Sequence, residues 1–88
     1  MLEKVYERLR DTYSCTLTNN SDTKSIEVDV GCGYVLTITH EVRIGLHVFT
    51  IVSNKGNKHV YIGCQIDNKG HSDLNPLYCF IDDFSGLL

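Results

Sequence analysis

Apolar side chains recur every three or four positions near the N-terminus of the chain. They share one face of a helix, and charged side chains fill the opposite face. The apolar stripe consists of Leu2, Val5, Tyr6, Leu9 and Tyr13. This pattern predicts an amphipathic helix over residues 2–13 that covers the domain's own sheet.

From residue 14 onward the apolar period shortens to two, which is typical of strands with one apolar face. Segments rich in Asn, Asp, Lys and Gly separate the alternating stretches and are typical of turns. Five strands are predicted, over residues 14–19, 26–30, 34–44, 46–53 and 59–67. Because the connections are short, consecutive strands are expected to pair as an antiparallel meander, with the first and fifth strands at its edges.

The C-terminal segment fits two structures. Its alternating apolar residues are compatible with a sixth strand. A helix is favoured because Asn75 suits an N-cap, Pro76 suits the first turn and Gly86 suits a C-terminal cap. We predict a short helix over residues 75–86, with the strand as the alternative.

These elements together predict a single α+β domain over residues 1–88. An N-terminal amphipathic helix packs on a five-stranded antiparallel meander sheet, and a short C-terminal helix closes the domain. A chain of 88 residues with 42% hydrophobic residues is long enough for one core and too short for a second domain.

Matching the apolar faces of neighbouring strands also predicts a register. The third and fourth strands are joined by a tight turn at Ile44 and Gly45, and the fourth and fifth by a loop over 54–57. The expected pairs are Val30 with Tyr34, Val28 with Leu36, Ile26 with Ile38, Arg43 with Leu46, Val42 with His47, His40 with Phe49, Ile38 with Ile51, Ile51 with Val60, Phe49 with Ile62 and His47 with Cys64.

This register brings His40, His47 and Cys64 together at one end of the covered sheet face. Two imidazoles and a thiol are donors that zinc accepts, and a cysteine beside a histidine base is a common nucleophile. The metal hypothesis has no obvious fourth ligand, and the nucleophile hypothesis has no oxyanion donor or orienting carboxylate. A metal-binding or thiol-chemistry domain is therefore an alternative, and we expect neither enzyme activity, nor a metal, nor another cofactor.

The opposite, outer face of the predicted sheet carries an apolar centre inside a polar rim, as docking surfaces often do. The expected partner-binding residues are Val35, Val48, Val52, Tyr61, Glu41 and Arg43. A C-terminal helix across this face would bury the apolar centre. Two helices on the inner face would leave it open.

Composition and charge exclude several classes of protein. The net charge is −3 and the basic residues are scattered, so we expect no direct nucleic-acid binding. The longest apolar run, residues 46–52, is far shorter than the roughly 20 residues of a membrane helix. The mixed charges of residues 1–10 are not typical of a signal peptide. We expect a cytoplasmic protein with no membrane association, whose four cysteines are free thiols rather than disulfides.

These exclusions and the outer face favour a small intracellular protein that binds another protein. We expect an inhibitor or regulator of the kind that small viral and mobile-element genes encode. A homodimeric structural subunit that pairs through an edge strand is a further alternative.

Overall fold

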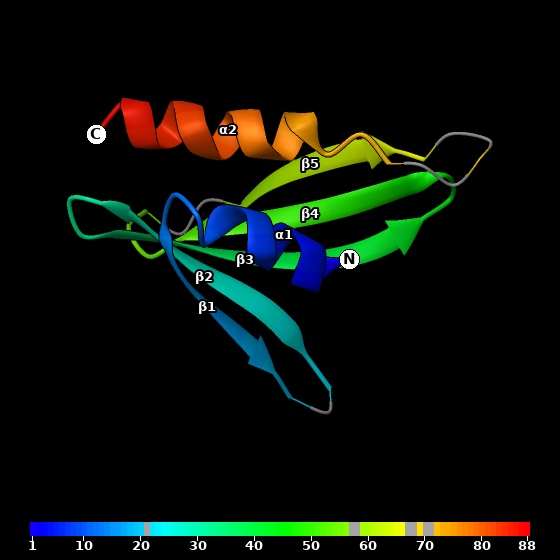
Figure 1. The fold of residues 1–88 in the computed structure, drawn as a ribbon, viewed down its shortest axis with the longest axis horizontal. Helices are drawn as coiled ribbons and strands as arrows, with labels where there is room; N and C mark the ends of the chain where they lie inside the picture. The colour runs from blue at the N-terminus through cyan, green and yellow to red at the C-terminus, as the bar shows by residue number, and fades with distance from the viewer. Residues whose placement is uncertain (21, 57–58, 67–68, 70–71) are drawn as a thin grey trace.

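The computed structural model describes residues 1–20, 22–56, 59–66, 69 and 72–88. It confirms the predicted α+β architecture, with the five strands ordered β1-β2-β3-β4-β5 in one antiparallel meander. Helix α2 runs along β5, and α1 lies beside β2 (Figure 1). The elements are α1 (Leu2–Leu9), β1 (Ser14–Asn19), β2 (Lys24–Gly31), β3 (Tyr34–Arg43), β4 (Leu46–Ser53), β5 (His59–Gln65) and α2 (Asn75–Gly86).

The strand bounds follow the alternating pattern closely. Strands β1 and β4 span their predicted residues, β2 begins two residues earlier at Lys24, and β3 is one residue shorter. Strand β5 ends at Gln65, after which Ile66 forms an isolated bridge with Ser72. Asn57 is the predicted end of the loop between β4 and β5, and Asp67 is the predicted end of the fifth strand. Both lie outside the described residues.

The predicted register is confirmed for every pair except Val30 with Tyr34. Gly31 pairs with Tyr34 instead, through a bulge between Asp29 and Gly31. The turn that follows has positive φ angles at Gly31 (101°), Cys32 (55°) and Gly33 (79°). Positive φ angles at all three positions reverse the chain more tightly than the predicted turn does. The bulge therefore leaves Val30 out of the register, and Gly31 takes its place opposite Tyr34.

Helix α1 is shorter than predicted and ends at Leu9 rather than at residue 13. The N–H groups of Thr12 and Tyr13 both bond to the Leu9 carbonyl, which closes the helix in a tight turn. Asp, Thr and Tyr at positions 11–13 are weak helix formers, in agreement with this early end. Tyr13 therefore lies outside the helix, and its hydroxyl donates a 2.6 Å hydrogen bond to Asp82 Oδ1 on α2.

Helix α2 spans the predicted residues, but its two caps differ from the prediction. Leu74 is the N-cap, and the Asn75 N–H bonds to Asp73 Oδ1 at 3.0 Å. Leu87 is the C-cap in a right-handed conformation, so Gly86 lies inside the helix. The N-cap residue Leu74 is buried in the core, so an apolar contact rather than a polar side-chain cap fixes the start of α2.

A single apolar cluster fills the space between the two helices and one face of the sheet, which we call the inner face. Helix α1 contributes Leu2, Val5 and Leu9, and α2 contributes Leu77 and Ile81. Among the described residues no polar or charged side chain is buried. The sheet contributes Ile26, Val28, Val30, Leu36, Ile38, Phe49, Ile51 and Cys64.

The alternation along β4 predicts opposite consequences for two neighbouring substitutions. Phe49→Ala removes a fully buried inner-face ring and should lower the free energy of unfolding by about 3–5 kcal/mol. Thr50→Ala, at the next and outward position, should cost about 1 kcal/mol or less. Urea unfolding followed by circular dichroism measures both values, and similar losses for the two variants would contradict the assigned faces.

Candidate functional site

Both helices pack on the inner face, so neither of the helices that the structure describes lies over the opposite face of the sheet, the outer face. Side chains alternate between faces along a strand, and the positions between the core residues point away from the helices. The predicted partner-binding residues all occupy these outward positions. They are Val35, Glu41 and Arg43 on β3, Val48 and Val52 on β4, and Tyr61 on β5.

Valines and one tyrosine lie among threonines on the outer face of β3, β4 and β5. Val48 pairs with Glu41 on one side and with Gly63 on the other. A Cβ placed on Gly63 would meet no atom within 4 Å, so β5 leaves open space beside Val48. Tyr61 pairs with Thr50 and is 66% exposed. An aromatic side chain of this exposure beside half-buried valines is the kind of anchor that interfaces use.

The polar rim of the outer face carries an unbalanced negative charge on β2. Glu41 and Arg43 neutralise each other through an exposed ion pair of 2.7 Å. Glu27 and Asp29 point outward from β2, and no ion pair within the described ranges involves either. Asp29 only accepts the Gly31 N–H, at 3.0 Å. The side of the face toward β1 is therefore acidic.

The structure brings His40 and His47 together on the inner face, where both side chains are half-buried. Their rings share a hydrogen bond of 2.8 Å between His40 Nε2 and His47 Nδ1. The His40 ring also lies 4.9 Å from the Phe49 ring, centroid to centroid. Burial lowers the pKa of His40, and the charge that His47 would carry lowers it further, whereas Glu41 acts in the opposite direction. Burial and the neighbouring His47 thus both favour the neutral form of His40.

Cys64 pairs with His47 in the register, as predicted, but its environment does not activate the thiol. The side chain is 1% exposed, and burial raises the pKa of Cys64. A reactive cysteine needs the opposite, a thiolate stabilised by nearby positive charge. The described residues, which include all three members of this cluster, contain no group of three or more His, Cys, Asp or Glu able to hold a metal ion.

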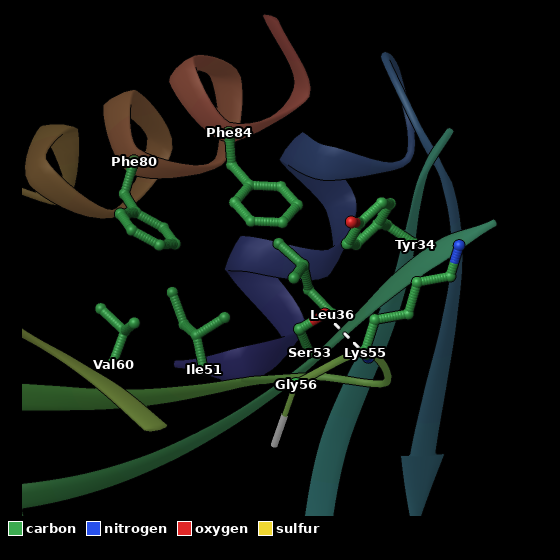
Figure 2. A pocket seen from close by; sticks show the side chains of 9 residues that line it. All are labelled: Tyr34, Leu36, Ile51, Ser53, Lys55, Gly56, Val60, Phe80 and Phe84. Atoms are coloured by element: carbon green, nitrogen blue, oxygen red, sulfur yellow. Dashed lines mark hydrogen bonds between the residues drawn. The ribbon is translucent and has the colours of Figure 1, made fainter. Parts of the chain in front are cut away.

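A pocket of about 320 Å³ lies between α2 and the sheet, and we call it the α2 pocket. Phe80 and Phe84 project from α2 toward the floor formed by Leu36, Ile51 and Val60 (Figure 2). Tyr34, Ser53, Lys55 and Gly56 complete its lining. The pocket is thus an apolar space with a single charged residue, Lys55, in its lining.

Sequence reasoning did not identify the α2 pocket. The apolar residues at positions 80 and 84 lie one helical turn apart, which indicates only a buried stripe. Lys55 belongs to a turn segment whose composition is explained by turn formation alone. A pocket forms from the space that side chains leave unfilled, and the periodicity of a chain carries no direct signal for such a space.

No model of a known protein family, no curated protein and no solved structure matches the chain. Over the described residues, neither helix has the length and apolar character needed to cross a membrane.

The four cysteines, all within the described residues, are free thiols, and their burial predicts the order in which they react. Cys32 and Cys79 are exposed and should be alkylated first by iodoacetamide. Cys15 and Cys64 should follow more slowly, because burial raises the pKa of both. Peptide mass spectrometry of timed samples measures the order. Alkylation of Cys64 in the folded protein faster than that of a free cysteine would restore the nucleophile hypothesis.

The lowered pKa of His40 predicts that the protein loses stability as the pH falls. Below the ordinary histidine pKa of about 6.5, the unfolded chain takes up a proton that folded His40 resists. The stability that the lowered pKa of His40 contributes is therefore fully present above pH 6.5. It declines as the pH falls and levels off below the pKa of His40 in the folded protein. Urea unfolding between pH 7.5 and pH 5.5 should show this decline, and His40→Gln should make it shallower.

The groups around His40 define the control for this measurement. His47, Glu41 and the N-terminal ammonium of Met1 act on its titration, and all three remain in the His40→Gln variant. His59→Gln changes the same type of residue on the outer face. An equal effect of both substitutions on the pH dependence would exclude the His40–His47 contact as its source.

Proposed function

We propose that the chain acts by binding another protein through the outer face, as an inhibitor or regulator. The observation that carries this proposal is the placement of both helices on the inner face. It leaves neither helix over the exposed Tyr61 and the half-buried Val35, Val48 and Val52. Apolar groups gathered in this way on an otherwise polar face lose contact with water when a partner covers them, which favours association.

The size of the outer face suits a protein partner rather than a single small molecule. Five strands about 4.8 Å apart and about eight residues long make a face of roughly 600 Å². A standard protein interface buries about 800 Å² on each partner. Such a partner must therefore cover the rim as well as the apolar centre, and it must meet the carboxylates on β2.

The charges on the rim define the chemistry of the partner. The negative charges of Glu27 and Asp29 on the outer face are not paired with a cation of the described residues. The charges of Glu41 and Arg43 already neutralise each other. We therefore propose a partner surface with apolar side chains at its centre and Lys or Arg on the side that meets β2. The same carboxylates disfavour contact with nucleic-acid phosphates.

Site-specific crosslinking tests this proposal. A photo-reactive phenylalanine in place of Tyr61 should crosslink one stoichiometric partner in the cells from which the chain comes. The same photo-reactive residue in place of Val42 is a matched control. Val42 is 62% exposed and Tyr61 66%, but Val42 occupies an inner-face position of its strand. The crosslink should form from position 61 and not from position 42.

The purified partner then provides the decisive measurement. Val52→Lys should weaken its binding at least tenfold, because a charge would be placed in the apolar centre, and Val42→Lys should not weaken it. The crosslinked segment of the partner should be apolar and basic. Equal crosslinking from both positions, or an acidic segment, would refute the proposal. A crosslink to a second copy of the chain would replace it with the homodimer alternative.

A further inference from the structure

The α2 pocket exists because the two flanks of α2 are held differently. On one flank, Tyr13 donates its hydroxyl to Asp82, and Ser85 Oγ donates to the Val30 carbonyl at 3.2 Å. These contacts fix the helix over the β2 side of the inner face. The other flank carries Phe80 and Phe84, which reach over the sheet without filling the space beneath them (Figure 2).

The walls of this space are almost entirely carbon. Leu36 and Ile51 are buried core residues at its floor, and Phe80 and Phe84 are half-buried above them. The Tyr34 ring meets the Phe84 ring edge to face at a centroid distance of 5.6 Å and closes one end. A ligand in the pocket must therefore present an apolar body.

Two contacts hold the Lys55 ammonium at the Tyr34 end of the pocket. The ammonium donates a 3.2 Å hydrogen bond to the Cys32 carbonyl and lies 4.5 Å from the centroid of the Tyr34 ring. A Cβ on Gly33 would come within 3.2 Å of the same nitrogen, so the absence of a side chain there makes room for it. The ammonium is thus positioned before any ligand arrives.

The backbone around Lys55 is fixed as well. Asn54 Nδ2 donates to the Gly33 carbonyl at 3.0 Å, and Asn54 Oδ1 accepts the Val35 N–H at 2.9 Å. These bonds join the turn after β4 to the turn before β3. The neighbouring Cys32 has the only positive φ of a non-glycine residue in the part of the chain that the structure describes, and its carbonyl holds Lys55.

From this combination we propose that the α2 pocket binds a small amphiphilic carboxylate. The apolar chain of the ligand lies between Phe80, Phe84 and the sheet, and its carboxylate accepts a hydrogen bond from the Lys55 ammonium. One of the three ammonium protons is donated to Cys32, which leaves two for the ligand. The volume of 320 Å³ corresponds to roughly ten water-sized groups, and hence to a chain of about eight to ten carbons.

Other classes of ligand fit the pocket less well. A phosphorylated ligand calls for several converging donors, whereas the lining contains a single cation. A sugar or a nucleobase needs several polar groups along the walls, and the lining supplies only the Ser53 and Tyr34 hydroxyls besides Lys55. Ser53 Oγ already accepts the Lys55 N–H at 3.1 Å.

Titration with a homologous series of straight-chain carboxylates tests the proposal. Hexanoate, octanoate, decanoate and dodecanoate, each below its micelle concentration, are measured by calorimetry and by chemical-shift changes of the pocket residues. The affinity should rise about fourfold with each methylene until the chain fills the pocket, and then level off. The alcohol of the best-binding length should bind at least tenfold more weakly, because it lacks the charge.

Variants separate the proposed site from general hydrophobic binding. Lys55→Met should weaken carboxylate binding about tenfold and leave alcohol binding unchanged. Lys4→Met removes the same charge from the exposed side of α1 and should have no effect. Val60→Phe should fill the pocket and abolish binding of the carboxylates and the alcohol alike. Thermal unfolding of each variant checks that it is folded.

Three results would overturn the proposal. The first is an affinity that rises with chain length without levelling off and is insensitive to Val60→Phe, which indicates unspecific adsorption. The second is an equal effect of Lys55→Met and Lys4→Met. The third is the absence of binding by every member of the series at millimolar concentration. Val48→Lys changes only the outer face, so retention of carboxylate binding in that variant separates this site from the proposed protein-binding face.

Discussion

The contact between one apolar sheet face and two short helices is the constraint on which the rest of the structure depends. All buried side chains of the described residues belong to this one cluster, and α1 and α2 together supply its upper layer. The described residues form two helices, α1 and α2. With both helices committed to the inner face, the outer face has no helical cover.

The same shortage of helical cover creates the α2 pocket and exposes the histidine pair. Helix α1 lies on β1 and β2, and α2 reaches from β5 toward β2. One end of β3 and β4 is covered only by the phenylalanine flank of α2, which leaves the pocket. At the opposite end Val42 is on the inner face by parity but is 62% exposed. His47, which pairs with Val42, and His40, two residues before Val42, lie at the same end and are half-buried.

The sheet was predictable from the sequence because two independent constraints agree. Apolar alternation selects the face of each strand, and the length of each turn selects the pairing. The two-residue turn at Ile44 and Gly45 sets Arg43 opposite Leu46, as predicted. The prediction was wrong at Val30, because three consecutive positive φ angles follow it and the pattern of apolar residues does not report backbone handedness.

The position of α2 was not predictable in the same way. Its residues Leu77 and Ile81 are fully buried, and Phe80 and Phe84 form a second, half-buried stripe beside them. An apolar surface this wide fits either face of a sheet, so the pattern left open which face the helix covers. The hydrogen bonds of Tyr13 and Ser85 with Asp82 and Val30 match the inner-face position, and such long-range contacts cannot be read from local periodicity.

The cluster of His40, His47 and Cys64 shows that a correct register does not determine chemistry. The sequence placed His47 opposite Cys64 correctly, yet burial raises the pKa of the thiol and lowers that of His40. Both shifts favour uncharged forms, as expected for groups partly removed from water. Proximity therefore identified the cluster, but the degree of burial determines its reactivity, and burial depends on where the helices end.

Strand β4 links the two proposed binding sites through its alternation. Ile51 and Ser53 line the α2 pocket, whereas Val52 between them belongs to the outer face. A slip of one residue in the pairing of β4 would exchange these positions, placing Val52 toward the pocket and Ile51 toward solvent. The tight turn at Ile44 and Gly45 prevents this slip, because Gly45 adopts a φ of 69° that other residues rarely accept. Both sites therefore depend on the turn that fixes the register, although neither contains it.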